Sequence, residues 1–182
     1  VGVWQAITIT GGTYTSRTWT TADYSQGGTG GLLVRSTGSH SINGWVDSGG
    51  WRGVHFDGLT FPAGALQGLV GSLRSQMDHE VVVTNCTFGT AGNTTFNPIL
   101  FRTGKSLKIR NNLFAGFLNG IFAMGVRAVE VGYNDFRDFL GDHIVLCVFD
   151  GNPTTGIGKG VLVDDHVYAW IHENTGRDQQ DN

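Results

Sequence analysis

The chain has few residues that interrupt, cross-link or strongly charge a polypeptide. Of its 182 residues only 3 are proline and 2 are cysteine, and charged residues make up 15%. Scarce proline argues against a disordered tract rich in proline and glycine. The net charge of −3 comes without a basic block, which argues against nucleic-acid binding. No apolar run reaches the length that a helix needs to cross a bilayer.

Glycine, in contrast, is abundant. Its 29 residues are roughly twice the average share, and they suit a fold with many tight bends. The length predicts one domain, covering residues 1–182. Because the sequence starts at Val1 and shows no signal peptide, we expect a processed product, a truncated chain or part of something larger.

The two cysteines, Cys86 and Cys147, both lie in apolar segments with the alternation of strands. Buried cysteine commonly behaves as a small apolar side chain. We therefore expect two free, buried thiols, not a disulfide or metal ligands.

Residues 106–146 contain two copies of one pattern. In the first copy, Leu107 and Ile109 are followed by Asn112 and Phe114. The second copy lies 22 residues later and consists of Val129, Val131, Asn134 and Phe136. A repeat of this length with alternating apolar residues is typical of a stacked solenoid.

Each copy can be explained by strand geometry. Leu107 and Ile109 point to one side of a short strand, while Lys108 between them points to the other. Asn112 is expected at a tight bend, because asparagine tolerates left-handed backbone and its amide can bond to the same amide in the next coil. Phe114 then begins a second strand, and Ile121 belongs to a third. Three strands per coil predict a right-handed parallel β-helix.

The pattern extends in both directions. It recurs around Val81–Phe88, Val54–Phe61 and Ile7–Tyr14, with Leu32 and Val34 as candidates for the coil between. Downstream, residues 169–174 restore the strand and the asparagine, which leaves room for an insertion loop at 150–160. The sequence therefore predicts about six to seven coils.

The repeat resembles that of the pectate-lyase-like right-handed β-helix superfamily and covers most of the chain. That superfamily includes polysaccharide lyases, pectin-type hydrolases, alginate epimerases and the shafts of phage tailspikes. The resemblance implies the fold and says little about the activity.

Two regions allow more than one interpretation. Residues 1–50 are rich in threonine, serine, glycine and aromatics, and part of them is expected to cap the first coil, because an open β-helix end presents bare strand edges. Alternatively, aromatic residues such as Trp19 and Trp45 stack on sugar rings as substrate-binding residues. Residues 62–80 fit either a helix, weakened by two glycines, or a longer coil.

The third strands predict an apolar surface strip. If Ile99, Ile121 and Ile144 point inward, the residues that alternate with them point outward in successive coils; these are Leu100, Phe122, Met124 and Val145. A contiguous apolar strip usually marks an interface or a covered surface. We expect either a loop of the chain or a side-by-side homotrimer to cover it.

A charged turn contains the candidate catalytic residues. Arg137 could neutralise a substrate carboxylate and His143 could act as base, with Asp142 beside it. Arg102 and Lys105, about a coil earlier, are candidate substrate-binding residues. The competing interpretation is a solvated turn with local pairing between aspartate and arginine.

No motif establishes a catalytic class. The Gly-His-Gly element of the superfamily's hydrolases is absent, and no Cys/His spacing typical of a metal site occurs. We expect no cofactor, although scattered aspartates could bind Ca²⁺. Two functions remain. The favoured one is a glycan-recognising domain of a spike, appendage or cell-surface or virion protein, weakly or not catalytic. The alternative is an extracellular lyase or epimerase acting on a polysaccharide that contains uronic acid.

Overall fold

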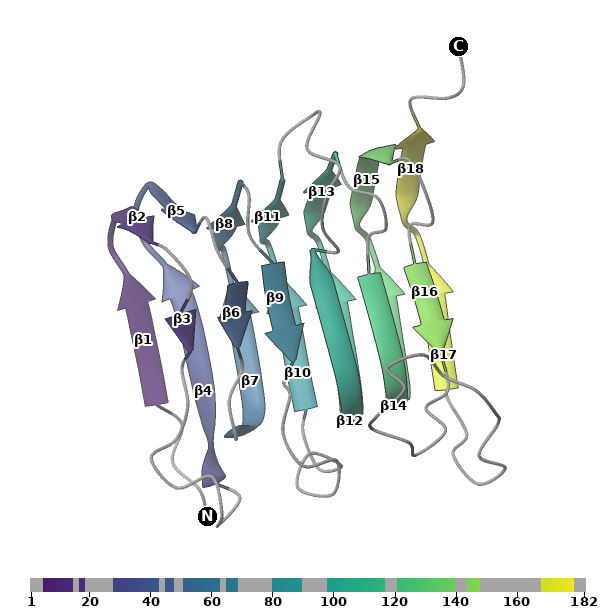
Figure 1. Ribbon diagram of the computed structural model, residues 1–182, viewed down its shortest axis with the longest axis horizontal. Coiled ribbons are helices and arrows are strands. Elements are labelled where there is room, and N and C mark those ends of the chain that lie inside the picture. Colours follow the sequence, from purple (N-terminus) through teal and green to yellow (C-terminus); the bar gives the residue numbers. More distant parts are fainter. Residues whose placement is uncertain are drawn as a thin grey trace.

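The computed structural model describes residues 5–14, 17–18, 28–42, 45–47, 51–62, 65–68, 80–89, 98–116, 121–139, 144–147 and 168–178. All regular structure in these ranges is β, and all the strand pairs are parallel. The strands form a right-handed parallel β-helix with three faces. In Figure 1 the chain ascends the rear face, crosses the top, descends the front face and advances one coil to the right.

Seven coils contribute strands to the first face, which we call face 1. In order along the solenoid they are β1 (Gln5–Ile9), β4 (Gly28–Ser36), β7 (Trp51–Asp57), β10 (Glu80–Thr84), β12 (Ile99–Arg110), β14 (Ile121–Gly132) and β17 (Tyr168–His172). Strands β12 and β14 are long and continue from face 3, so only their second halves belong to face 1.

The other two faces complete each coil. Face 2 contains β2 (Gly12–Tyr14) and β5 (His40–Ile42), then β8 (Thr60–Phe61), β11 (Thr87–Phe88), β13 (Leu113–Ala115), β15 (Asp135–Phe139) and β18 (Thr175–Asp178). Face 3 contains β3 (Arg17–Thr18), β6 (Trp45–Asp47), β9 (Ala65–Gly68), the first halves of β12 and β14, and β16 (Ile144–Cys147). Residues 65–68 form strand β9, as expected for a longer coil and not for a helix.

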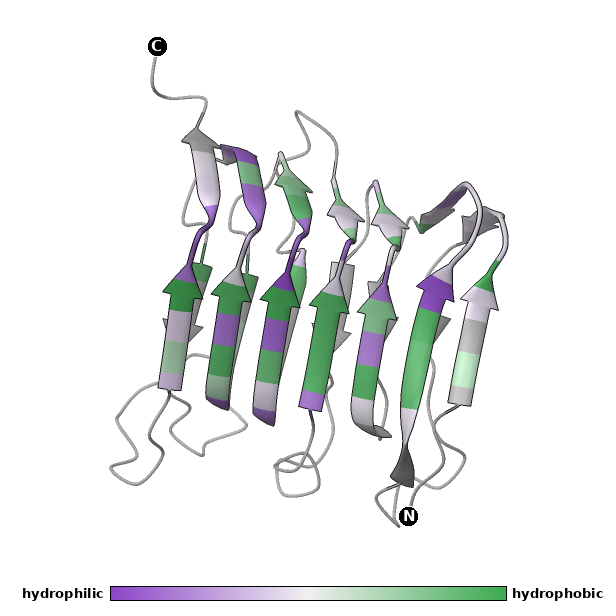
Figure 2. Cartoon of the chain, turned by 180° about the vertical axis from the view of Figure 1, so that it is seen from behind, coloured by the Kyte–Doolittle hydropathy of each residue, from purple (hydrophilic) through white to green (hydrophobic). Residues whose placement is uncertain are grey.

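The core consists of columns of identical or similar side chains. Val83, Ile109 and Val131 lie in register and are fully buried. On face 2, the rings of Phe61, Phe88, Phe114 and Phe136 stack with centroids 4.9 Å apart at each step. Figure 2 shows the matching alternation of hydrophobic and hydrophilic residues along the face 1 strands. The predicted core register is confirmed.

A ladder of buried asparagines fastens the corner between faces 1 and 2. Oδ1 of Asn134 accepts from the backbone N–H of Asn112 at 3.0 Å and from its Nδ2 at 2.9 Å. Asn174 repeats both contacts with Asn134, at 3.0 and 2.9 Å. Asn112 and Asn134 are 2% and 1% exposed, so the bonds are shielded from water. The ladder is therefore as predicted, and it continues into the last coil.

The left-handed residue of the corner is not the one expected. The positive φ angles occur one position earlier, at Asn111 (56°) and Tyr133 (58°), and not at Asn112 and Asn134. The reason is that the preceding residue makes the bend, which turns the ladder asparagine inward to bond the next coil. Gly58 and Asn85 hold the same position in earlier coils, and both residue types tolerate this backbone.

Cys86 occupies the ladder position in β10's coil, where the asparagine is missing. Its backbone N–H donates to Oδ1 of Asn112 at 2.9 Å. Its thiol faces the carbonyls of Phe56 and Thr84 at 3.8 and 3.2 Å, the same two positions that Asn112 Nδ2 bonds one coil later. Burial raises the pKa of the Cys86 thiol to about 12, so the free thiol stays protonated at neutral pH.

We expect Cys86→Asn to be tolerated and to extend the ladder by one rung. The new amide would donate to the Phe56 and Thr84 carbonyls and accept from the Leu59 N–H, which now contacts the sulfur at 3.4 Å. Each added hydrogen bond is worth about 0.5–1.5 kcal/mol net. Urea unfolding should rank Cys86→Asn at or above the wild type and Cys86→Ala below both. An asparagine variant less stable than the alanine variant would contradict this account of the corner.

Candidate binding site

Polar and aromatic side chains collect on the outer surface of face 1. The parallel register forms two outward columns there, since inward and outward residues alternate along each strand. One column contains His55, Val82, Lys108, Glu130 and Trp170, and the other contains Asp57, Thr84, Arg110, Gly132 and His172. Face 1 is therefore a flat sheet carrying titratable and aromatic groups in fixed rows.

A hollow of about 360 Å³ lies at the C-terminal end of this face. It is lined by Ser106, Leu107, Lys108, Ala128, Val129, Glu130, Tyr168, Ala169 and Trp170. Ser106 and Ala128 lie in register with Tyr168, and their small side chains leave space beside its ring. Tyr168 and Trp170 are 72% and 60% exposed, so the hollow has two accessible aromatic walls.

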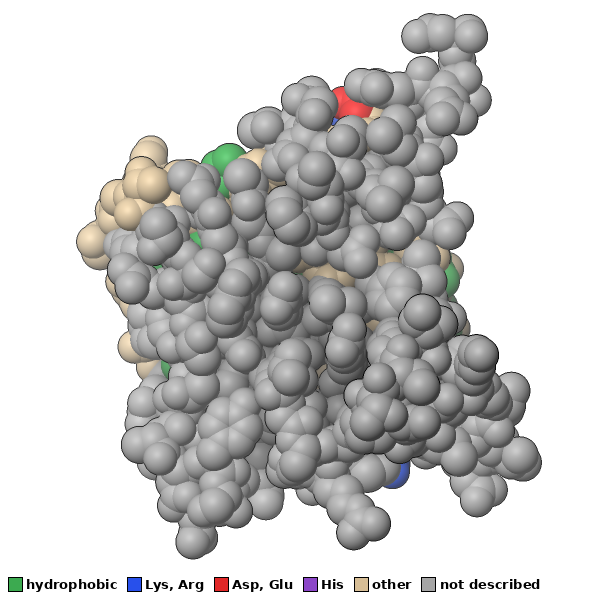
Figure 3. All heavy atoms as spheres, in the orientation of Figure 1, with side chains coloured by type: hydrophobic (Ala, Val, Ile, Leu, Met, Phe, Trp, Pro, Cys, Tyr) green, Lys and Arg blue, Asp and Glu red, His purple; other side chains and the backbone are tan. Residues whose placement is uncertain are grey.

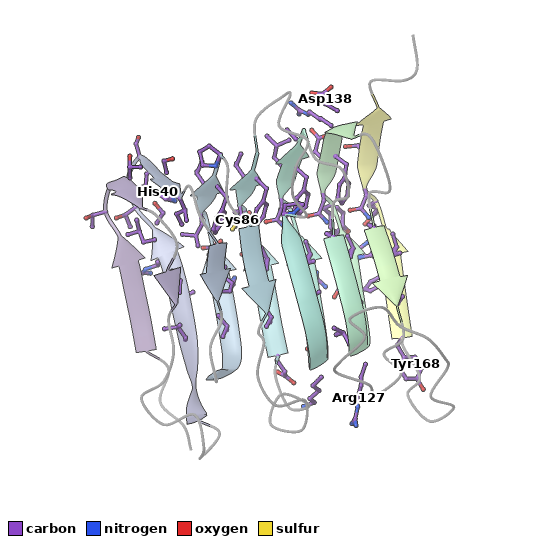
Figure 4. All side chains as sticks on the ribbon, in the orientation of Figure 1. His40, Cys86, Arg127, Asp138 and Tyr168 are labelled. Atoms are coloured by element: carbon purple, nitrogen blue, oxygen red, sulfur yellow. The ribbon has the colours of Figure 1, made fainter. Side chains whose placement is uncertain are left out.

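Positive charge borders the hollow. Lys108 is exposed and, within the described ranges, has no ion-pair partner. Arg127, also exposed, immediately precedes Ala128, the register partner of Tyr168. Figure 4 shows Arg127 and Tyr168 at the same edge of the solenoid. A ligand lying in the hollow would meet aromatic surface and at least one available ammonium group.

Glu130 is a buried carboxylate on the wall of the hollow, 9% exposed. Its Oε1 accepts from Arg110 Nε at 2.7 Å and faces His172 Nε2 at 3.3 Å. Burial raises its pKa, but the hydrogen bonds from Arg110 and His172 outweigh burial, and the net pKa is lowered. Glu130 is therefore ionised at neutral pH and already paired, which does not suit it to donate a proton as a general acid.

Two aromatic rings contact the imidazole of His172 in the last coil. The Trp170 ring stacks on it with centroids 4.0 Å apart at 20°, and the Tyr133 ring meets it edge-on at 5.2 Å. Its Nδ1 lies 3.0 Å from Oε2 of Glu173. The imidazole thus positions Trp170, one wall of the hollow.

A second cluster of polar side chains lies on β7 and β10, on the N-terminal side of the hollow. The Thr84 hydroxyl donates to Asp57 Oδ1 at 2.8 Å, and its oxygen lies 2.7 Å from His55 Nε2. Because the single hydroxyl proton is directed at Asp57, the oxygen accepts from an Nε2–H. Asn85 Nδ2 also donates to Asp57, at 2.7 Å. His55 is therefore held in one orientation by a chain of hydrogen bonds.

Of the predicted catalytic residues, the structure describes Arg137. Its guanidinium is exposed and pairs with Asp135 on the same strand, through Nε at 2.8 Å. Asp135 raises the pKa of Arg137 further above its usual range. Asp142 and His143 lie outside the described residues, so their role stays a prediction. Arg137 is on face 2 and does not belong to the hollow.

The predicted substrate-binding residues are spread over several places. Lys105 is exposed and forms an ion pair with Glu80 at 2.8 Å, near the hollow's lining residue Ser106. Arg102 lies in β12 and Trp45 in β6, but their side chains are outside the described part, as is the whole of Trp19. Residues 150–160 are likewise outside it.

The backbone register of the apolar strip is as expected. Leu100 pairs with Phe122, which pairs with Val145, and Ile99 and Ile121 beside them are fully buried. The side chains of the strip lie outside the described part, so its cover by a loop or a homotrimer stays a prediction. In the space-filling view of this side, described side chains form only scattered patches (Figure 3).

Sequence reasoning missed the hollow, although one signal was present. The sequence predicts a strand from Ala169 to Ile171, so Trp170 between two inward residues is expected to point outward. The tryptophans that the sequence suggested as sugar-stacking residues, Trp19 and Trp45, come from the N-terminal region instead.

Among the described residues, no group of three or more His, Cys, Asp or Glu side chains could hold a metal ion. The same residues include no helix long and apolar enough to span a membrane. No family model, curated protein or solved structure gives a significant match to this chain. The fold and the site therefore carry the functional argument.

Proposed function

We propose that this chain is a glycan-recognising β-helix domain that binds polysaccharide at the hollow on face 1. The observation that carries the proposal is the pair of exposed rings, Tyr168 and Trp170, beside the exposed side chain of Lys108. Aromatic faces suit the apolar C–H faces of sugar rings. Lysine adds a hydrogen-bond donor for hydroxyl or acidic groups.

The architecture supports a polymeric ligand. A solenoid presents an extended, rigid surface that can contact several units of a chain. Strands β12, β14 and β17 fix the lining residues in adjacent rows, so little ordering entropy is lost on binding. The pairing of Glu130 with Arg110 and His172 favours binding over catalysis at the hollow.

The biological setting belongs to the same proposal. The repeat resembles the pectate-lyase-like superfamily, whose members include tailspike shafts. We infer a spike, appendage or cell-surface or virion protein, working extracellularly or at a virion surface, with a homotrimer packed through face 3. Polysaccharide is its proposed partner.

We expect Trp170→Ala to weaken polysaccharide binding about tenfold, which corresponds to about 1.4 kcal/mol and to the upper range for one aromatic contact. Affinity electrophoresis in gels containing alginate, polygalacturonate, chondroitin sulfate or a neutral β-glucan measures this. Lys108→Ala should weaken retention by the acidic gels more than retention by the neutral one. Arg35→Ala, which removes an exposed cation on β4 far from the hollow, is the matched control. Relative to its own mobility in a ligand-free gel, it should be retarded as much as the wild type.

Equal migration of the wild type with and without every polysaccharide would refute the proposal. Equal retention of wild type and Trp170→Ala would place binding elsewhere on the chain. Either result is clear only if both proteins unfold at the same urea concentration, which is checked in parallel.

A second candidate is the polysaccharide lyase or epimerase. It is supported by the oriented imidazole of His55, whose hydrogen bond to Thr84 leaves Nδ1 as a lone pair able to accept a proton. Ultraviolet absorbance of unsaturated uronates, followed in the same polysaccharide mixtures, distinguishes the two. A rise that is lost in His55→Ala would favour the enzyme, and a flat trace with retention in the gels would favour the binding domain.

A further inference from the structure

His172 joins the last coil to the two before it through a chain of charged groups. Arg110 of β12 donates to Glu130 of β14, and Glu130 faces Nε2 of His172 at 3.3 Å. The other ring nitrogen, Nδ1, faces Glu173 at 3.0 Å. One imidazole thus lies between two carboxylates that come from neighbouring coils.

Whether both contacts are hydrogen bonds depends on how many protons the His172 ring carries. An ionised carboxylate can only accept hydrogen bonds, and a neutral imidazole carries only one N–H. Both contacts of His172 are therefore hydrogen bonds only when the ring carries two protons. In the neutral ring, one lone pair would face either Glu130 or Glu173 and repel it.

Two carboxylates and two aromatic rings surround the imidazole. Burial raises the pKa of Glu130, but hydrogen bonds from Arg110 and then His172 outweigh it and lower the pKa. The Tyr133 hydroxyl and His172 lower the pKa of Glu173. Trp170 covers one face of the ring at 4.0 Å, and an aromatic face attracts a cation. The nearby positive charges are Arg110, which donates to Glu130, and Lys108, which lies in register with Glu130. Tyr133, whose hydroxyl bonds to Glu173, completes the titratable groups around the ring.

Two backbone features show that the sequence accommodates this cluster. Gly132 lies beneath the ring, and a Cβ there would come within 2.4 Å of His172 Nε2. Tyr133 and Glu173 both hold left-handed backbone, at φ 58° and 51°, where earlier coils have Gly58, Asn85 and Asn111. Tyrosine and glutamate adopt this conformation at a cost. Their side chains contact each other and His172, which compensates for the unfavourable backbone.

We propose that His172 is a proton-operated switch for the hollow: with two protons it clamps Glu130 to Glu173 and fixes Trp170 as a wall, and with one it releases that wall. The expected effect on ligand binding rests on the proposed glycan-binding function. The proton-dependent contacts of His172 rest on the geometry of the cluster alone. Binding should therefore be stronger at mildly acidic than at mildly alkaline pH.

The direction of the pH dependence follows from the number of protons on the His172 ring. Histidine side chains change charge between about pH 5 and 8, and loss of the second proton breaks one carboxylate contact. At the acid end the limit is Glu130. Its lowered pKa means that its contribution to stability is present above its ordinary value of 4.5 and is lost as the pH falls through the lower, folded value.

Two measurements test the switch without a ligand. Proton–nitrogen NMR of the imidazole rings should show His172 with two attached protons at about pH 5.5 and one at about pH 8. Tryptophan fluorescence should change over the same range in the wild type and not in Trp170→Phe. His172→Phe, which keeps a stacked ring without N–H groups, should abolish the change, and His55→Gln should retain it.

Affinity electrophoresis with alginate tests the consequence, since alginate carboxylates stay ionised over this range. Retention should weaken roughly fivefold or more from about pH 5.5 to 8, the lower end of typical coupling between sites. Glu173→Gln should reduce this dependence, because a carboxamide can donate to the deprotonated Nδ1 as well as accept from the protonated one.

The outcomes separate the two proposals. A His172 ring with one unchanged protonation form and constant fluorescence between these pH values would overturn the switch, whatever alginate does. Retention that is equally strong at both pH values would overturn it as well and leave glycan binding intact. Proton-dependent NMR and fluorescence without retention by any polysaccharide would support the clamp and refute the binding function.

Discussion

Phe114→Ala should lower the free energy of unfolding by about 3–5 kcal/mol, the usual cost of removing a buried phenylalanine. The expected loss lies in this range because Phe114 is fully buried between two parallel rings, Phe88 and Phe136, each with its centroid 4.9 Å away. Removing the middle ring leaves a cavity that the rigid coils above and below cannot close. Urea unfolding followed by circular dichroism measures the loss.

The control for Phe114→Ala is Lys105→Ala. Lys105 and its partner Glu80 are 59% and 50% exposed, and an ion pair so exposed contributes at most about 1 kcal/mol. The two variants should therefore differ by several-fold in destabilisation. Comparable losses in both would mean that the phenylalanine column is not the main stabilising feature of face 2.

Asn134→Ala is the second substitution expected to have a large effect. It removes the acceptor for the Asn112 N–H and Nδ2 and the donor to the carbonyls of Ile109 and Gly132, all at 2.9–3.0 Å. Leaving a buried polar group without a partner costs about 1–3 kcal/mol. The Asn112 N–H is left without its acceptor, while Asn112 Nδ2 keeps the carbonyls of Val83 and Arg110. With about 0.5–1.5 kcal/mol added for each of the two lost hydrogen bonds to carbonyls, the free energy of unfolding should fall by roughly 2–6 kcal/mol.

Asn174→Ala is the matched control at the end of the ladder. Asn174 makes the same contacts to Asn134 but is only half-buried, so water can replace part of what is lost. It should destabilise by less than half as much in the same urea titration. Equal effects at Asn134 and Asn174 would show that burial does not set the strength of the ladder.

Much of the fold could be predicted because its determinants are local and repeated. Alternation in Leu107–Lys108–Ile109 establishes which side chains face inward, and the recurrence at Val129 and Val131 aligns the strands. The position of the left-handed residue was predicted one place late. Asparagine satisfies two separate requirements at this corner, a bend and an inward amide, and the sequence does not show that neighbouring residues divide them.

The candidate site was harder to predict because its parts come from different coils. Glu130 and His172 are 42 residues apart, and their contact depends on how the chain returns after the longest gap in the repeat. Lys108 and Trp170 become parts of one hollow only through the register of β12, β14 and β17. Residues close in sequence, such as Arg137 and Asp135, were easy to group but form a local surface pair.

The sequence by itself determined the β-helix, the stacked phenylalanines and the asparagine ladder, because each follows from a short pattern that repeats along the chain. Only the tertiary structure decided which outward side chains become neighbours. Outward residues have no periodic constraint of their own, since solvent accepts almost any of them. Their grouping around Trp170 and His172 arises from stacking coils of unequal length, which brings distant residues to a common edge at the strand spacing of about 4.8 Å.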